Sequence, residues 1–152
     1  GVEAAVRAAL AAGWCELEAR NNDGDTAILL ASYEGNVECM RLLAEAGCNT
    51  AVIGGSTGVN ALMCAAQSGV AAAVRTALAA GWCELDARTK LGITAFLCAC
   101  YTGNVECMQL LAEAGCNTAV ITNAGVNALM YAAESGVAAA VRTALAAGWC
   151  EL

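Results

Sequence analysis

The sequence contains two identical seventeen-residue stretches, at Gly69–Leu85 and at Gly136–Leu152. Gly1–Leu17 is the same stretch with two substitutions. A second block fills the intervals, because Gly35–Ile53 and Gly103–Ile121 differ at one position only. Self-similarity at a fixed period is typical of repeat proteins, in which each unit packs on its neighbours instead of contributing to one shared core. The sequence therefore predicts a linear array.

Glycines mark the boundaries within each repeat. Three series run through the chain with steps of 33 or 34 residues: Gly1, Gly35, Gly69, Gly103 and Gly136; Gly13, Gly47, Gly81, Gly115 and Gly148; and Gly24, Gly58, Gly92 and Gly125. Glycine serves where the backbone needs a positive φ or where two backbones approach closely. We expect three fixed corners in each repeat.

Helical periodicity fills the intervals between these corners. Residues 70–80 carry Val70, Val74, Ala77 and Leu78 at helical spacing, so we expect these four side chains on one face, with Val70 and Leu78 buried between repeats. Each such helix should end at a glycine of the second series. Shorter helices, each beginning with a Thr or Asn that can cap it, are expected over 26–33, 60–67, 94–101 and 127–134. The result is four helix pairs preceded by one unpaired outer helix.

Short motifs that recur at these corners resemble the ankyrin repeat. Residues 24–29 (GDTAIL) and 92–97 (GITAFL) stand where that family has G-x-T-P-L-H, residues 58–63 and 125–130 are the Asn variant, and 42–47 (LLAEAG) matches L-L-x-x-G. The resemblance covers the whole chain and implies an all-α, ankyrin-type helical solenoid with β-turn hairpins between repeats. The tetratricopeptide repeat has a similar period, but its Trp-Leu-Gly-Tyr and Pro signature is absent.

The resemblance also sets the expected boundaries and two departures from the family. We expect one array over 1–152, in which 1–24 is an unpaired outer helix with its loop, and 25–58, 59–92, 93–125 and 126–152 are successive repeats, as a window of a longer array. The family's Pro is Ala here. Its His, which ties neighbouring loops by hydrogen bonds, is Leu or Met, so these loops must be held in another way.

Composition argues against several classes of function. A net charge of −7 and seven scattered basic residues disfavour a nucleic-acid partner. No apolar run reaches the length of a membrane span. The sequence contains no histidine and no C-x-x-C, and Gly54–Gly58 lacks the Lys of a phosphate-binding loop. We therefore expect a non-catalytic protein without a metal or cofactor.

Ten cysteines leave the redox state open. Five occupy one equivalent loop position: Cys15, Cys48, Cys83, Cys116 and Cys150. Free, small hydrophobic thiols are the favoured interpretation, because neighbouring repeats lie about 8–10 Å apart and a disulfide needs Cα atoms within about 7 Å. A bridge between Cys100 and Cys107 remains a possibility, as do bridges to another chain. Free thiols would suit the cytoplasm, and cross-chain disulfides would suit an extracellular setting.

Aromatic and loop residues supply the candidate interface. Trp14, Trp82 and Trp149 recur in every second repeat. Each indole either covers the adjacent repeat or belongs to an exposed row of anchors for a partner. The resemblance implies binding through loop tips and the concave face of the inner helices, where Tyr33, Tyr101, Lys90, Leu91 and Asn123 lie.

Two hypotheses for function follow from these observations. The first is a structural scaffold whose repeats stack on further repeats or on other copies of the chain, forming a fibre or an extended superhelix. A solenoid needs polar capping repeats to stay soluble, and neither end of this sequence has one. The second is a protein–protein interaction module that binds a different protein on its concave face.

Overall fold

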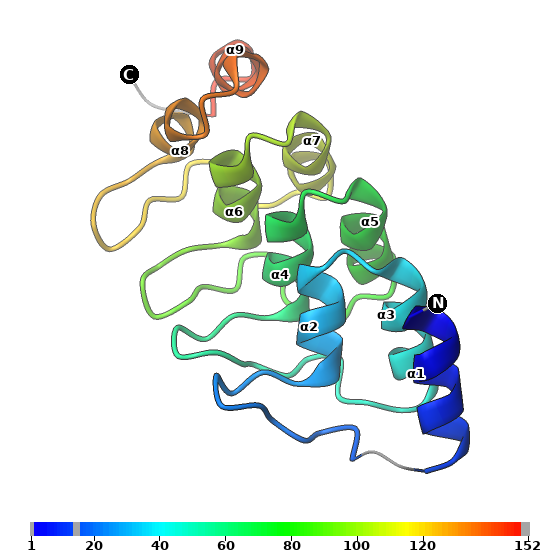
Figure 1. Ribbon diagram of the computed structural model, residues 1–152. Coiled ribbons are helices and arrows are strands. Elements are labelled where there is room, and N and C mark those ends of the chain that lie inside the picture. Colours follow the sequence, from blue (N-terminus) through cyan, green and yellow to red (C-terminus); the bar gives the residue numbers. More distant parts are fainter. Residues whose placement is uncertain (1, 14–15, 150–152) are drawn as a thin grey trace.

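The computed structural model describes residues 2–13 and 16–149, and these residues form an open array of helices in two rows (Figure 1). The inner row, beside the hairpins, contains α2 (Ala27–Tyr33), α4 (Ala61–Ser68), α6 (Ala95–Thr102) and α8 (Ala128–Glu134). The outer row contains α1 (Val2–Ala11), α3 (Val37–Glu45), α5 (Ala71–Ala79), α7 (Val105–Glu113) and α9 (Ala138–Ala146). Four inner–outer pairs preceded by the unpaired α1 confirm the predicted solenoid.

Polar side chains begin most of the helices as the sequence predicted. Asn60 and Asn127 accept a hydrogen bond from the backbone N–H three residues on, and Thr94 does the same at the start of α6. Thr26 is the exception, since its side chain makes no capping bond at α2. Its backbone is extended like that of the other caps, but its hydroxyl is buried without a hydrogen-bond partner. The prediction that Thr26 caps its helix is therefore wrong.

Glycine forms the corners of each repeat. Every member of the three series between Gly13 and Gly148 has a positive φ. After α3, the N–H of Gly47 bonds to the carbonyl of Ala44 and the N–H of Cys48 bonds to that of Leu43, the pair of bonds that defines a Schellman ending. The predicted fixed corners are confirmed in the described part of the chain.

Apolar burial lies between successive repeats and extends along the array. Val74 and Ala77 of α5 are almost completely buried, but Val70 is 37% exposed and Leu78 is half-buried. The expectation of burial between repeats is wrong for Val70, because α5 begins at Ala71 and Val70 is its N-cap, outside the packed face. Leu78 packs against the core but is only partly buried. The core is thus one residue layer per repeat, shared with the neighbours.

Backbone hydrogen bonds join the tips of neighbouring hairpins. The N–H of Lys90 donates to the carbonyl of Thr57 at 2.8 Å, and the N–H of Asn123 donates to that of Leu91 at 3.0 Å. The Asn123 side-chain amide also donates to the carbonyl of Lys90, at 2.8 Å. These bonds supply part of what the absent His would have supplied.

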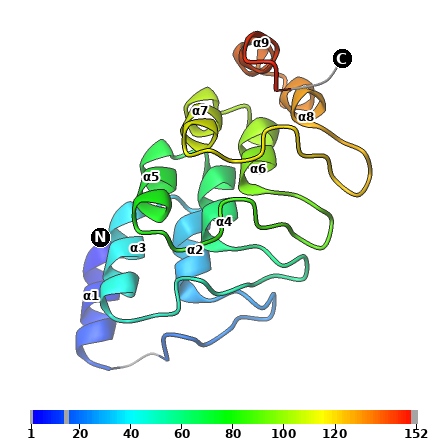
Figure 2. The same cartoon turned by 180° about the vertical axis from the view of Figure 1, so that it is seen from behind.

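Two arginines tie further hairpins together. The guanidinium of Arg20 donates to the carbonyl of Ile53 at 2.9 Å, and that of Arg88 donates to the carbonyl of Ile121 at 2.5 Å. Each bond joins the stem of one hairpin to the next. The hairpins therefore follow one another along the inner helices, linked by single hydrogen bonds, and Figure 2 shows them from the opposite side.

The longest helix of the described residues, α1, has ten residues. None of the described helices is both long and apolar enough to cross a membrane.

Candidate protein-binding surface

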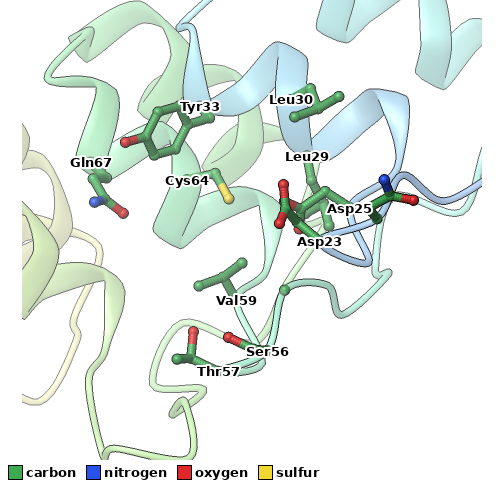
Figure 3. A pocket seen from close by; sticks show the side chains of 12 residues that line it. Asp23, Asp25, Leu29, Leu30, Tyr33, Ser56, Thr57, Val59, Cys64 and Gln67 are labelled. Atoms are coloured by element: carbon green, nitrogen blue, oxygen red, sulfur yellow. The ribbon is translucent and has the colours of Figure 1, made fainter.

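We call the hairpin side of the inner helices the concave surface. Its first hollow lies between α2, α4 and the first two hairpins (Figure 3). It has a volume of about 480 Å³. The floor includes Leu29 and Cys64, and Val59 forms part of the hairpin wall. Tyr33 and Gln67, from the ends of the two inner helices, close one side. The hollow is thus apolar at its base and polar at its rim.

Negative charge gathers at one end of this hollow. Asp23 and Asp25 lie next to each other there, on the first hairpin (Figure 3). One carboxylate oxygen of Asp25 is buried and has no hydrogen-bond partner. Among the residues that line the hollow none is basic. Carboxylates in this arrangement can accept hydrogen bonds from an Arg or Lys side chain of a partner.

Two further hollows follow along the same surface. One, of about 180 Å³, is lined by Gln67, Cys98, Tyr101 and Tyr131 among others. Its two tyrosine rings meet edge to face with centroids 5.7 Å apart. The other, of about 340 Å³, lies by the last two hairpins and includes Leu91 and Asn123 in its lining. The described part of the concave surface therefore carries several small depressions, of which the second and third share Ile93 and Tyr131.

The predicted interface residues separate into two groups. Four of them line the hollows of the concave surface: Tyr33 the first, Tyr101 the second, and Leu91 and Asn123 together the third. Lys90 lies at a hairpin tip, where its ammonium donates to the carbonyl of Ser56 at 3.0 Å. Lys90, Leu91 and Asn123 therefore meet at the tips of two neighbouring hairpins, whereas Tyr33 and Tyr101 line separate hollows.

The tryptophans lie elsewhere. Trp82 and Trp149 are half-buried and pack against the core. The ring of Trp149 meets Phe96 edge to face at 5.1 Å, so it covers the inner helix of the preceding repeat. Of the two alternatives for the tryptophans, Trp82 and Trp149 therefore fit the one in which the indole covers the adjacent repeat, and not the one in which it is an exposed anchor. Trp14 lies outside the described residues.

The prediction from the sequence did not include one set of residues that line the hollows. Leu30, Cys64, Cys98 and Tyr131 occupy the same position of the four inner helices, and all four line the first two hollows. A signal was available, because the neighbouring helix positions hold mostly Ala, Leu or Met, whereas this position changes from Leu to Cys to Tyr. A position that varies within a repeated frame is expected on a surface that does not pack against the next repeat.

Eight cysteines of the described residues are free thiols, including Cys100 and Cys107, so the possible bridge between these two is absent. Burial raises the pKa of both, to about 12 for Cys100 and about 11 for Cys107. A thiol held protonated in this way is a poor nucleophile and a poor metal ligand. The described residues contain no group of three His, Cys, Asp or Glu side chains placed to hold a metal ion. Cys15 and Cys150 lie outside the described residues.

Comparison with known proteins identifies the repeat. A model of the family described as ankyrin repeats (3 copies) matches residues 2–81 and 62–148, nearly the whole chain. A comparison with curated proteins gave no match. Ankyrin repeats are protein–protein interaction modules. With its paired helices, hairpins and positive-φ corners in agreement with that match, this chain belongs to the ankyrin repeat family.

Proposed function

We propose that the chain is a non-catalytic scaffold whose repeats stack on further repeats or on other copies of the chain. The observation that carries the proposal is the open state of its last pair of helices. Met130 of α8 is 53% exposed, whereas Met63, at the same position of α4, is 1% exposed. Both helices have a preceding repeat against them, so the difference comes from the following one. The face of α8 and α9 is built like an interior interface, and none of the described residues covers it as the third helix pair covers α4.

The absence of histidine and the high pKa values of the buried thiols support the non-catalytic part of the proposal. The commonest general base is missing, and the cysteines are held in their unreactive form.

Sedimentation velocity over a range of protein concentrations, followed by electron microscopy, tests the stacking. We expect the mean sedimentation coefficient to rise with concentration and extended particles to appear. A single monomeric species that persists at the highest attainable concentration would contradict self-stacking.

The first hollow favours a second candidate function, the binding of a basic segment of a different protein on the concave surface. Its support is the pair Asp23 and Asp25 beside an apolar floor, in a lining that contains no basic residue. Titration with an Arg-containing extended peptide, followed by the fluorescence of a dye on the peptide, tests this candidate. Binding should weaken when both residues are changed to Asn, and should be unaffected by Glu113→Gln, an exposed acid of the outer row. Equal effects of the two changes would indicate nonspecific charge attraction.

A further inference from the structure

An apolar groove opens at the N-terminal end of the array, between α1, α2 and α3. It has a volume of about 350 Å³. Val6 and Leu10 of α1 form one wall, Ala27 and Ala31 of α2 form another, and Leu43 of α3 lies at the base. Among the described residues α1 is an outer helix without an inner partner (Figure 1). The groove occupies the place that such a partner would take.

The same groove occurs inside the molecule, where α4 fills it. There α5, α6 and α7 stand in the places of α1, α2 and α3. Val74, Ala99 and Leu111, the counterparts of groove residues, are completely buried. Ala95 is 2% exposed, whereas Ala27 at the same position of α2 is exposed. The interior copy therefore shows which kind of helix covers these side chains.

The C-terminal end of the chain carries that kind of helix. The nine residues of α9 are identical to those of α5, and the first seven of α4 match α8 except at Cys64 and Gln67. On the receiving side, α3 differs from α7 only by Arg41, which is exposed. α2 differs from α6 at Ile28, Leu30 and Ser32, of which only Leu30 lines the groove. The two open ends of the molecule thus hold the two halves of an interface that is already formed between its second and third helix pairs.

We propose that α8 and α9 of one copy dock on α2 and α3 of a second copy, with α8 in the N-terminal groove and α9 in the place of α1. This inference rests on the proposed scaffold function and specifies the surfaces and the partner. The docked helices reproduce the interior interface between α4–α5 and α6–α7.

An ion pair supports this placement. Inside the molecule, Arg75 of α5 pairs with Glu106 of α7 across the interface. At the N-terminal end, Arg7 of α1 makes the equivalent pair with Glu38 of α3, at 2.9 Å. Arg142 of α9 is the counterpart of Arg75 in sequence. When α9 takes the place of α1, Arg142 can replace Arg7 as the partner of Glu38, so the charge on α3 remains paired.

An amide bond supports it as well. The side chain of Asn104 donates to the carbonyl of Gly69 at 2.6 Å, which ties the third helix pair to the second. The same two positions at the open ends are Asn36 and Gly136. Docking therefore offers Asn36 the acceptor that its counterpart already uses.

Displacement of α1 requires little free energy. None of its residues is buried, in contrast to every other helix of the described chain. The incoming pair has the same outer helix together with an inner helix that covers the groove. Segments with few buried apolar contacts are the first to open in native proteins. The exchange therefore replaces weak contacts with the more extensive contacts seen inside the array.

Growth follows from the geometry. Docking uses a different face on each copy, and each added copy presents a new open α8–α9 face. Contacts of this heterologous kind that do not close into a ring give filaments.

Complementary variants test the two faces. Ala27→Glu places a carboxylate in the groove, at the start of α2 where negative charge favours the helix. Met130→Glu places one on the exposed α8 face, and Ala133→Glu is a second variant of that face. Each should reduce assembly at least tenfold in sedimentation velocity, with an unchanged circular dichroism spectrum. Ala72→Glu, an exposed first-turn alanine of α5, should assemble like the parent protein.

The mixture is the decisive measurement. An Ala27→Glu copy keeps its C-terminal face and a Met130→Glu copy keeps its groove, so equal amounts should form dimers and nothing larger. Hydrogen exchange on assembly should accelerate in a peptide covering α1 and slow in peptides covering α2 and α3.

The outcomes separate the two proposals. If the parent protein assembles but the groove and face variants assemble equally well, the docking is wrong and the scaffold function stands. Protection of α1 in the assembly would also overturn the exchange. If the parent remains monomeric at every concentration, both the docking and the self-stacking part of the scaffold proposal are refuted.

Discussion

Met63 and Met130 offer a matched test of how much stability each repeat takes from its neighbour. The two side chains occupy the same position of α4 and α8, are preceded by Asn-Ala-Leu in both cases, and differ in exposure from 1% to 53%. We expect Met63→Ala to destabilise the fold much more than Met130→Ala.

The magnitude follows from burial. Truncation of a fully buried Met to Ala costs about 2–5 kcal/mol, because it removes apolar contacts and leaves a cavity. At Met130 about half of the side chain is already in water and no cavity can be enclosed, so the loss should be roughly 1 kcal/mol. The difference in the free energy of unfolding should therefore be at least about 1.5 kcal/mol.

Urea unfolding followed by far-ultraviolet circular dichroism measures this difference, at a protein concentration at which sedimentation shows monomers. The linear dependence of the free energy on urea gives each value in water. Equal losses for the two variants would refute the reasoning, because they would mean that the next repeat contributes nothing to the burial of Met63.

Three further predictions use the same monomeric conditions. Gly103→Ala should lower the free energy of unfolding by at least about 1 kcal/mol more than Gly136→Ala. Both glycines have φ near +70°, but a Cβ at Gly103 would meet side chains of the next repeat at 2.6 Å, whereas a Cβ at Gly136 meets nothing within 4 Å. Equal losses in urea unfolding would mean that the repeats can separate freely. Asn60→Ala should lower stability by about 1 kcal/mol through loss of its 2.9 Å capping bond to the backbone N–H of Met63, and an Ala variant of unchanged stability would contradict the cap. The free energy of unfolding should fall above about pH 9, because burial raises the pKa of thiols such as Cys64 to about 12 and the unfolded chain ionises them first. Its slope against pH should be up to about 1.4 kcal/mol per pH unit for each thiol. Cys64→Ala should reduce that slope in pH-dependent melts, and an unchanged slope would exclude a contribution from this thiol.

Local signals explain why so much of the fold could be predicted from the sequence. A positive-φ glycine, a capping Asn and a 3.6-residue period each act within a few residues, and the repeats state them several times. The bounds of α4 differ from the predicted 60–67 by one residue at each end. The exact start of α5 was harder to predict, because Val70 fits the apolar face as well as a cap position. Thr26 has the residue type of a cap, but its side chain is buried instead. That burial depends on tertiary contacts, which a local pattern does not reveal.

The candidate site was less accessible to prediction. Its surface residues could be placed on the concave side through the resemblance, as Tyr33 and Tyr101 were. The depth of the first hollow depends on the path of the second hairpin, which brings Ser56 and Thr57 opposite Asp23, and no short-range pattern encodes that distance. The edge-to-face contact of Trp149 with Phe96 likewise joins residues of different repeats.

Identity between α5 and α9 also bears on how the chain refolds. Because the two helices have the same nine residues, α4 can capture either one during folding, and the wrong choice loops out the 67 residues that separate their starting positions. Such misregistered intermediates are characteristic of repeat proteins. Refolding from denaturant is therefore expected to show a slow phase, whose amplitude falls when α9 alone is given a different apolar sequence.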